Sequence, residues 1–197
     1  MPAGYRRAGS AENDAHHICV VGADWHSAER HAVLWGDSNA EQLMPLLDVA
    51  GRQENVAIAV ADRCPAIIHR GGVQRYLSFV PPDYNDICSL HRDAVAGFLR
   101  NSSDIQLVIL ASAWSLLTDQ IYLTDPDKRA TEGGLRLLRA GLDDLVHDIA
   151  ASGRNIVLFA DVPFVPLKDP AACGFGLPRR GCLGDLGRAV RQSFDAS

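Results

Sequence analysis

Four short runs of aliphatic and β-branched residues alternate along the chain with longer segments in which apolar residues follow helical spacing. The runs cover residues 31–35, 55–61, 105–111 and 155–160. The last three are almost continuously apolar, which is typical of strands buried on both faces of a sheet. Strands that alternate in this way with helices predict an α/β fold with a mostly parallel sheet.

Three amphipathic helices are expected in the segments that follow the first three runs. The first covers 38–51, with Ser38 or Asn39 as its N-cap and Gly51 as its stop. The second covers 86–101 and the third covers 131–153. The residues expected to face the core are Leu43, Leu46, Leu47 and Ala50, then Leu90, Ala94, Phe98 and Leu99, then Leu135, Leu138, Leu142, Leu145 and Ile149.

Composition places the chain among ordinary globular proteins. Hydrophobic residues make up 47% and charged residues 22% of the 197 residues. The polar, small-residue segment 1–17 predicts a tail or linker ahead of one domain, 18–197, and it has no signal-peptide pattern. The net charge of −5, with no long cluster of Lys and Arg, argues against a nucleic-acid partner.

Five cysteines allow more than one interpretation: Cys19, Cys64, Cys88, Cys173 and Cys182. No Cys-x-x-Cys pair occurs, so the pattern gives no support for a zinc site, and no metal is expected. Cys64 and Cys88 flank one loop rich in Gly, Pro and Asp, and Cys173 and Cys182 flank another. Each pair is either a disulfide in an oxidising compartment or a pair of reduced thiols, and the pattern alone leaves both open.

The first strand run ends abruptly in Gly36-Asp37-Ser38, and the first helix follows. Ligands and catalytic groups of open parallel sheets gather at such carboxyl ends of strands. The turn lacks the glycine and lysine pattern of phosphate-binding loops. Two interpretations remain: an ordinary helix cap, or a serine nucleophile in the positive field of a helix N-terminus, with its own N–H free to hold an oxyanion.

A series of further motifs carries a family resemblance. The stretch "VLWGDSNAEQLMPLLDVAG" is similar to block I of the SGNH, or GDSL, hydrolase superfamily. Cys19 before the strand, "RCPAI" after the second strand, Cys88 before a helix, "LVILASAW" and "VLFADVPFVP" extend the similarity over about residues 18–182. Together they resemble the periplasmic SGNH domain fused to bacterial membrane acyltransferases that O-acetylate surface polysaccharides. This resemblance implies a flavodoxin-like three-layer α/β sandwich.

The resemblance also implies roles for individual residues. Ser38 corresponds to the nucleophile that forms an acyl-enzyme, and its N–H to one oxyanion donor. Asp37 corresponds to the block I acid that orders the turn after Gly36. Gly71 is the nearest candidate for the block II glycine. Trp114 stands where the superfamily has Gly-x-Asn-Asp, so it can shape the pocket but cannot supply the asparagine donor.

The family's catalytic Asp-x-x-His follows a fifth strand. The sequence ends in a helical pattern that would precede this strand, so we expect the last strand and the catalytic Asp and His to be missing, and the chain as given to be nearly inactive. The internal Asp144-x-x-His147 lies in the third helix, ahead of the fourth strand, and is interpreted as a solvated helix face. His26 and His31 are expected at the far end of the first strand or in the loop that leads to it, and His69 and His91 around the Cys64–Cys88 loop. All four are interpreted as loop or surface residues, and His69 is the one expected near the active edge.

The resemblance implies an O-acyltransferase domain that transfers an acyl group, first of all acetyl, to a hydroxyl of a cell-surface glycan through a serine acyl-enzyme. It implies an integral membrane acyltransferase domain as partner, no cofactor, and a periplasmic or extracytoplasmic location tethered to the inner membrane. It favours a Cys64–Cys88 disulfide, with Cys173–Cys182 as a second. The alternatives are a free-standing SGNH esterase, which uses water as acceptor, and a non-catalytic glycan-binding or docking module.

Overall fold

The structure of the 197-residue chain is a computed structural model. It describes residues 6–7, 19–68, 73–75, 83–117, 121–123 and 134–160, all within the compact unit 1–161. The predictions for Gly71, for His69, for the Cys173–Cys182 pair and for the end of the fold beyond the fourth strand lie outside these residues.

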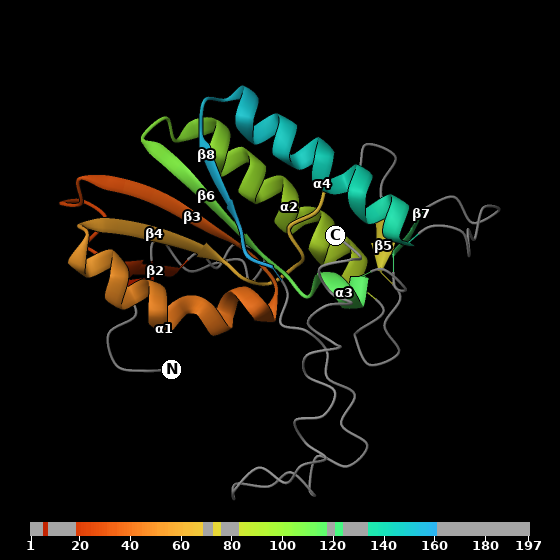
Figure 1. Ribbon diagram of the computed structural model, residues 1–197, viewed down its shortest axis with the longest axis horizontal. Helices are drawn as coiled ribbons and strands as arrows, with labels where there is room; N and C mark the ends of the chain where they lie inside the picture. Colours follow the sequence, from red (N-terminus) through yellow and green to blue (C-terminus); the bar gives the residue numbers. More distant parts are fainter. Residues whose placement is uncertain are drawn as a thin grey trace, which may run out of the picture. The chain divides into compact units, whose positions relative to one another are not determined.

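A six-stranded sheet forms the centre of the described part of the chain (Figure 1). Its order is β1 (Arg6–Arg7), β2 (Cys19–Gly22), β4 (Val56–Ala61), β3 (Arg30–Gly36), β6 (Ile105–Ala111) and β8 (Asn155–Leu158). The last four strands of this order are parallel to one another. They are the four predicted strands, arranged in the order 2-1-3-4 that is typical of flavodoxin-like sheets. The predicted α/β fold class is confirmed.

Two further strands extend the sheet at one edge. β2 pairs antiparallel with β4, and β1 pairs antiparallel with β2. β1 lies inside the segment predicted as a tail or linker, and the division of the chain at residue 17 stays a prediction. A separate two-stranded antiparallel sheet joins β5 (Val73–Arg75) to β7 (Ile121–Leu123).

Helices cover both faces of the large sheet. α1 (Ser38–Gln53) covers one face, and α2 (Tyr84–Asn101) and α4 (Gly134–Ala151) cover the other (Figure 1). Because successive residues of a strand point to opposite faces, Ala32 and Leu34 of β3 join the core beneath α1, whereas Val33 and Trp35 join the core beneath α2 and α4. The three layers of the predicted sandwich follow from this alternation.

The buried faces of the helices differ in part from the predicted ones. In α1 the buried residues include Ala40 and Met44, whereas Leu46 is 61% exposed. In α4 the predicted Leu138, Leu145 and Ile149 are buried, but Leu135 is 42% exposed. Apolar spacing predicts that a helix has a buried face, but the contacts with the sheet decide which residues lie on that face.

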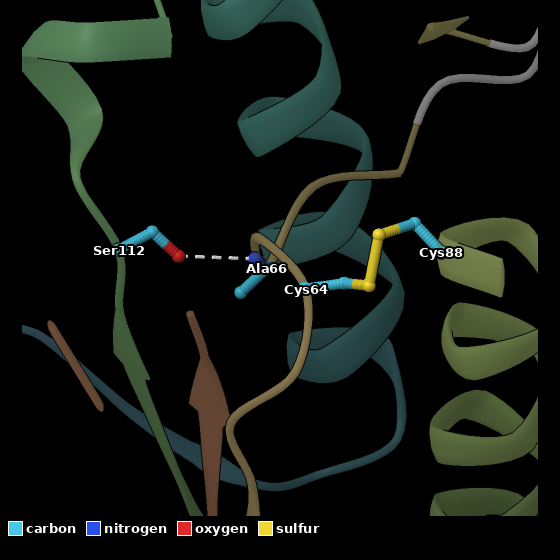
Figure 2. Close-up of a disulfide and its surroundings, with 4 residues drawn as sticks. All are labelled: Cys64, Ala66, Cys88 and Ser112. Atoms are coloured by element: carbon cyan, nitrogen blue, oxygen red, sulfur yellow. Dashed lines mark hydrogen bonds between the residues drawn. A yellow bond between two sulfur atoms is a disulfide. The ribbon is translucent and has the colours of Figure 1, made fainter. Parts of the chain in front are cut away.

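The rotation of α2 is fixed by a disulfide. Cys88 in its first turns is bonded to Cys64 in the loop after β4, with Cα atoms 5.5 Å apart (Figure 2). Cys88 therefore faces inward, and His91 and Val95 follow it on the buried side. Leu90 points away and is 57% exposed, so its predicted core position is wrong. The predicted Cys64–Cys88 disulfide is confirmed.

Gly51 does not end α1, contrary to the prediction. The helix continues to Gln53, and Asn55 just beyond it adopts the left-handed conformation (φ 52°) that ends many helices. Gly51 is buried inside the helix, where an added Cβ would lie 2.7 Å from the Val56 carbonyl oxygen and 2.8 Å from the Gly22 Cα. A glycine is needed there because α1 approaches the backbone of β2 and β4.

Candidate active site

Ser38 lies at the carboxyl end of β3, where the chain turns into α1. It is the first residue of the helix, and its side chain is exposed. β3 lies between β4 and β6. The chain runs from β3 through α1 to β4 on one side and then crosses from β4 through α2 to β6 on the other side, which makes the end of β3 the switch point where open α/β sheets bind ligands. The predicted place of Ser38, on a turn that opens a helix at the end of a central strand, is confirmed.

Gly36 brings the ends of two strands unusually close. It pairs with Ala111, the last residue of β6. A Cβ added to Gly36 would lie 1.6 Å from the Ala111 carbonyl oxygen and 2.9 Å from the Ala40 Cβ. A backbone oxygen at this distance cannot be displaced without moving a strand, so only glycine fits here.

Asp37 joins the turn to the loop that follows β6. Its carboxylate is buried and accepts hydrogen bonds from the Asn39 N–H (3.0 Å) and the Ala113 N–H (3.0 and 3.2 Å to its two oxygens). Its own N–H donates to the Ala111 carbonyl oxygen (3.3 Å). The N-cap of α1 is therefore Asp37, so the predicted N-cap at Ser38 or Asn39 is wrong. The same carboxylate also ties two loops together.

In the first turn of α1, three of the four backbone N–H groups donate hydrogen bonds to described residues, and the N–H of Ser38 does not. The Asn39 N–H is capped by the Asp37 carboxylate, and the Ala40 and Glu41 N–H groups donate to the Asp37 carbonyl oxygen at 2.8 and 3.2 Å. Among the described residues, the Ser38 N–H has no acceptor. An N–H beside an exposed serine hydroxyl, at the positive end of a helix, is suited to hold an oxyanion.

The comparison with protein families agrees with this geometry. The family model described as "SGNH domain (fused to AT3 domains)" matches residues 5–194. The chain belongs to this family. Its SGNH domain is thus a module associated with AT3 domains, which are membrane acyltransferases. No curated protein and no solved structure matches the chain.

Trp114 lies at the same edge of the SGNH domain, in the short helix α3 (Trp114–Leu117). Its side chain is nine-tenths buried, and its indole N–H donates to the Phe159 carbonyl oxygen (2.8 Å) just after β8. The tryptophan thus joins the loops that follow β6 and β8. Its role in shaping a pocket stays a prediction.

The described histidines of the SGNH domain lie away from the turn or in another layer. His26 is exposed in the loop between β2 and β3, as predicted. His31 is near the amino end of β3, 2.8 Å from the Trp25 carbonyl oxygen and 3.5 Å from the Asp104 carboxylate. His147 is exposed near the end of α4, which leads to the amino end of β8. His91 is buried on α2, across the sheet from α1, so its interpretation as a loop or surface residue is wrong.

Asp62 is a titratable group at this edge that the sequence analysis did not single out. It directly follows β4, whose last pair with β3 is Ala61 with Trp35. Burial raises the pKa of the Asp62 carboxyl above its ordinary value, against a smaller lowering by a hydrogen bond from its own backbone. The sequence could have indicated this position, because Asp62 directly follows a buried strand. The carboxyl ends of neighbouring parallel strands lie close together, so such an acid is expected near the Ser38 turn.

A separate cavity of about 550 Å³ lies at the opposite ends of the parallel strands, their amino ends. Its lining includes Arg100, Ile105, Arg154 and Asn155, at the amino ends of β6 and β8, so it is not part of the Ser38 site. Within the described ranges, no group of three or more His, Cys, Asp or Glu side chains could hold a metal ion. The helices of the same ranges include none that is long and apolar enough to cross a membrane.

Proposed function

We propose that this SGNH domain performs the serine-dependent part of an O-acyl transfer, with Ser38 as the nucleophile. One observation carries the proposal: the exposed Ser38 hydroxyl and its unaccepted N–H stand together at the head of α1, in a chain of this family. The acyl group is acetyl, and the acceptor is a hydroxyl of a cell-surface glycan.

The proposed reaction has two steps. The Ser38 Oγ attacks the carbonyl carbon of the acyl donor, a base takes the hydroxyl proton, and the Ser38 N–H holds the developing oxyanion. The bond to the leaving group breaks, the leaving group takes up the proton, and an acyl-enzyme remains. A glycan hydroxyl then attacks the carbonyl carbon of the acyl-enzyme and passes its proton to the base. The ester bond to the Ser38 Oγ breaks, the acyl group stays on the glycan oxygen, and the Oγ takes the proton back from the base.

The base of this reaction is proposed to come from outside the described residues. His31 and His147 belong to the amino-edge half of the described domain, and His91 is buried in the opposite layer. His69 is the proposed candidate within the chain, and a group of the partner domain is the other source. The partner is proposed to be a membrane acyltransferase domain that supplies the acyl group on the periplasmic side.

Trapping of the acyl-enzyme tests the proposal. The full chain is incubated with p-nitrophenyl acetate, quenched in acid and analysed by peptide mass spectrometry. We expect one acetyl group on the peptide that contains Ser38, formed far more slowly than by a typical esterase because the chain as given is expected to be nearly inactive, and none in Ser38→Ala. The matched control is Ser103→Ala, which removes an exposed serine at the opposite edge and should leave acetylation unchanged.

The outcomes separate the alternatives. Release of acetate to water as fast as to an added oligosaccharide would identify an esterase. Absence of any Ser38 acetyl-enzyme would exclude the proposal and favour a binding or docking module. Loss of acetylation in His69→Ala, with wild-type behaviour in His147→Ala, would assign the base; the reverse result would restore the internal Asp144-x-x-His147 pair.

A further inference from the structure

Ser112 and Ala113, the two residues that follow β6, form hydrogen bonds with two different loops. The Ser112 hydroxyl accepts a hydrogen bond from the Ala66 N–H at 3.1 Å (Figure 2). The next N–H along the chain, that of Ala113, donates to the Asp37 carboxylate. Ser112, Ala66 and Asp37 are all buried, with exposed fractions of 1%, 0% and 6%. Water therefore does not replace these bonds if a partner is removed.

The topology gives the Ser112–Ala66 bond a special place. β3 lies between β4 and β6, so a bond between the loops after β4 and β6 passes across the end of β3. Ala66 and Trp114 belong to the core beneath α2 and α4, whereas α1 leaves from the end of β3 on the other face. The joined loops therefore contact the Ser38 turn from the face of the sheet opposite to α1.

The Cys64–Cys88 disulfide fixes the loop after β4, which carries Ala66, to α2. Cys64 is fully buried, lies two residues before Ala66, and is bonded to Cys88 of α2 (Figure 2). The loop after β4 is thus fixed to α2 by a covalent bond and to the loop after β6 by a hydrogen bond. Bonded contacts run without a gap from α2 through Cys64, Ala66 and Ser112 to the Asp37 carboxylate.

We infer that Ser112 is a positioning residue for the nucleophile: its hydroxyl fixes the loop after β6 against the disulfide-anchored loop, so that Ala113 holds Asp37 and Asp37 holds the first turn of α1. This inference rests on the proposed function of Ser38. Ser112 touches no reacting atom, and it acts only through the orientation of Ser38 and its N–H. Without the hydroxyl, the buried Ala66 N–H loses its acceptor and the two loops separate.

The test compares Ser112→Ala with Ile105→Val in the full chain. Ile105 is buried at the other end of the same strand, so its variant loses packing without touching the support. The first measurement is amide hydrogen exchange at Ala113 and Asn39. The second is the rate of Ser38 acetylation by p-nitrophenyl acetate as a function of its concentration.

In Ser112→Ala we expect faster exchange at both amides and a saturating acetylation rate about tenfold to a hundredfold lower, with little change in the half-saturating concentration. Ile105→Val should unfold at lower urea but keep both local exchange and rate. Ser112→Thr, which keeps the hydroxyl, should restore the rate. Wild-type exchange and rate in folded Ser112→Ala would overturn the inference.

Two other results remain decisive. If Ser38 is not acetylated in the wild type, the proposed function fails, while amide exchange in Ser112→Ala still decides whether Ser112 holds the turn. If Ser112→Ala does not fold, reduction of the wild type with dithiothreitol gives the test, because it releases Cys64 and loosens Ala66. Unchanged protection of Ala113 and Asn39 in reduced, folded protein would overturn the inference.

Discussion

Gly36, Asp37 and Ser38 have three different physical tasks in one turn. Gly36 lets the backbones of β3 and β6 meet, and the buried Asp37 carboxylate binds N–H groups on both sides of the turn. Ser38 is left exposed, with its N–H open. The geometry of the proposed nucleophile therefore depends on two neighbours that do not react.

Replacement of Gly36 by alanine should destabilise the fold strongly. The new Cβ would meet the Ala111 carbonyl oxygen at 1.6 Å, and the clash can be relieved only by separating β3 from β6. We expect a loss of about 2–3 kcal/mol or more in the free energy of unfolding, measured by urea denaturation. A loss below about 1 kcal/mol would show that the strands yield more easily than close packing implies.

Gly97→Ala is the matched control for this substitution. Gly97 lies inside α2, and its added Cβ would meet only the Arg100 guanidinium at 3.8 Å. Alanine favours helical conformation over glycine by about 0.5–1 kcal/mol, so this variant should be slightly more stable than the wild type.

Asp62→Asn should raise stability at neutral pH. Burial raises the folded-state pKa of Asp62 above the ordinary 3.8, so the folded protein binds more protons than the unfolded chain between these two values. Stability therefore falls as the pH rises through this window, and the penalty is complete above it. The asparagine variant avoids the penalty.

Urea unfolding of both proteins over a pH series measures this effect. The stability advantage of Asp62→Asn should be greatest near pH 7 and should vanish as the pH falls below about 3.8. A variant that is less stable than the wild type at pH 7, with the gap closing in acid, would mean that the fold stabilises the carboxylate.

At the scale of elements, Arg154 joins the ends of three elements at the amino edge. Its guanidinium donates to the carbonyl oxygens of Leu99 (2.6 Å) and Ser102 (2.9 Å) at the end of α2, and to that of Ile105 (3.1 Å) at the start of β6. Carbonyl oxygens at the end of a helix lack intrahelical donors and carry partial negative charge, so a cation is favoured there. Arg154 itself immediately precedes β8.

Arg154→Ala should cost about 2 kcal/mol or more of unfolding free energy, because several charge-assisted hydrogen bonds are lost together. Ser38 acetylation should be unchanged in the folded variant, since Arg154 lies at the opposite edge. Urea denaturation and the acetylation assay measure the two effects. Loss of acetylation in folded protein would contradict the separation of the two edges.

Arg52→Ala provides the comparison for a surface pair. Arg52 bonds Asp48 four residues earlier on α1, at 2.8 Å, with its side chain 61% exposed. Exposed pairs of this spacing contribute only about 0.3–0.5 kcal/mol. If Arg52→Ala lost as much unfolding free energy as Arg154→Ala, then neither the exposure of an arginine nor the number of its hydrogen bonds would explain its contribution to stability.

At the scale of the whole described domain, the two ends of the parallel strands carry different groups of side chains. Arg154 and His31 fasten the amino edge, whereas the Ser38 turn, Asp62 and the disulfide-supported loops lie at the carboxyl edge. In the strand order 2-1-3-4, the helical connections next to β3 lie on opposite faces of the sheet. The carboxyl end of β3 is therefore left accessible to a ligand. The proposed chemistry and much of the local stability can therefore be changed separately.

The four parallel strands, the three long helices and the place of Ser38 between strand and helix could all be predicted from the sequence. These features depend on local periodicity and on a turn of three residues, and both can be read along the chain. The motif order also determined the family, which the match over residues 5–194 confirmed.

The buried side of each helix and the groups that support Ser38 could not be predicted, because they depend on contacts between distant parts of the chain. Leu90 and Cys88 fit an apolar helix face about equally well, and the bond to Cys64 selected Cys88. The contacts of Ser112 with Ala66 and of Ala113 with Asp37 span 46 and 76 residues. Such contacts leave no periodic signal, because they arise only when the strand order brings the ends of β4, β3 and β6 side by side.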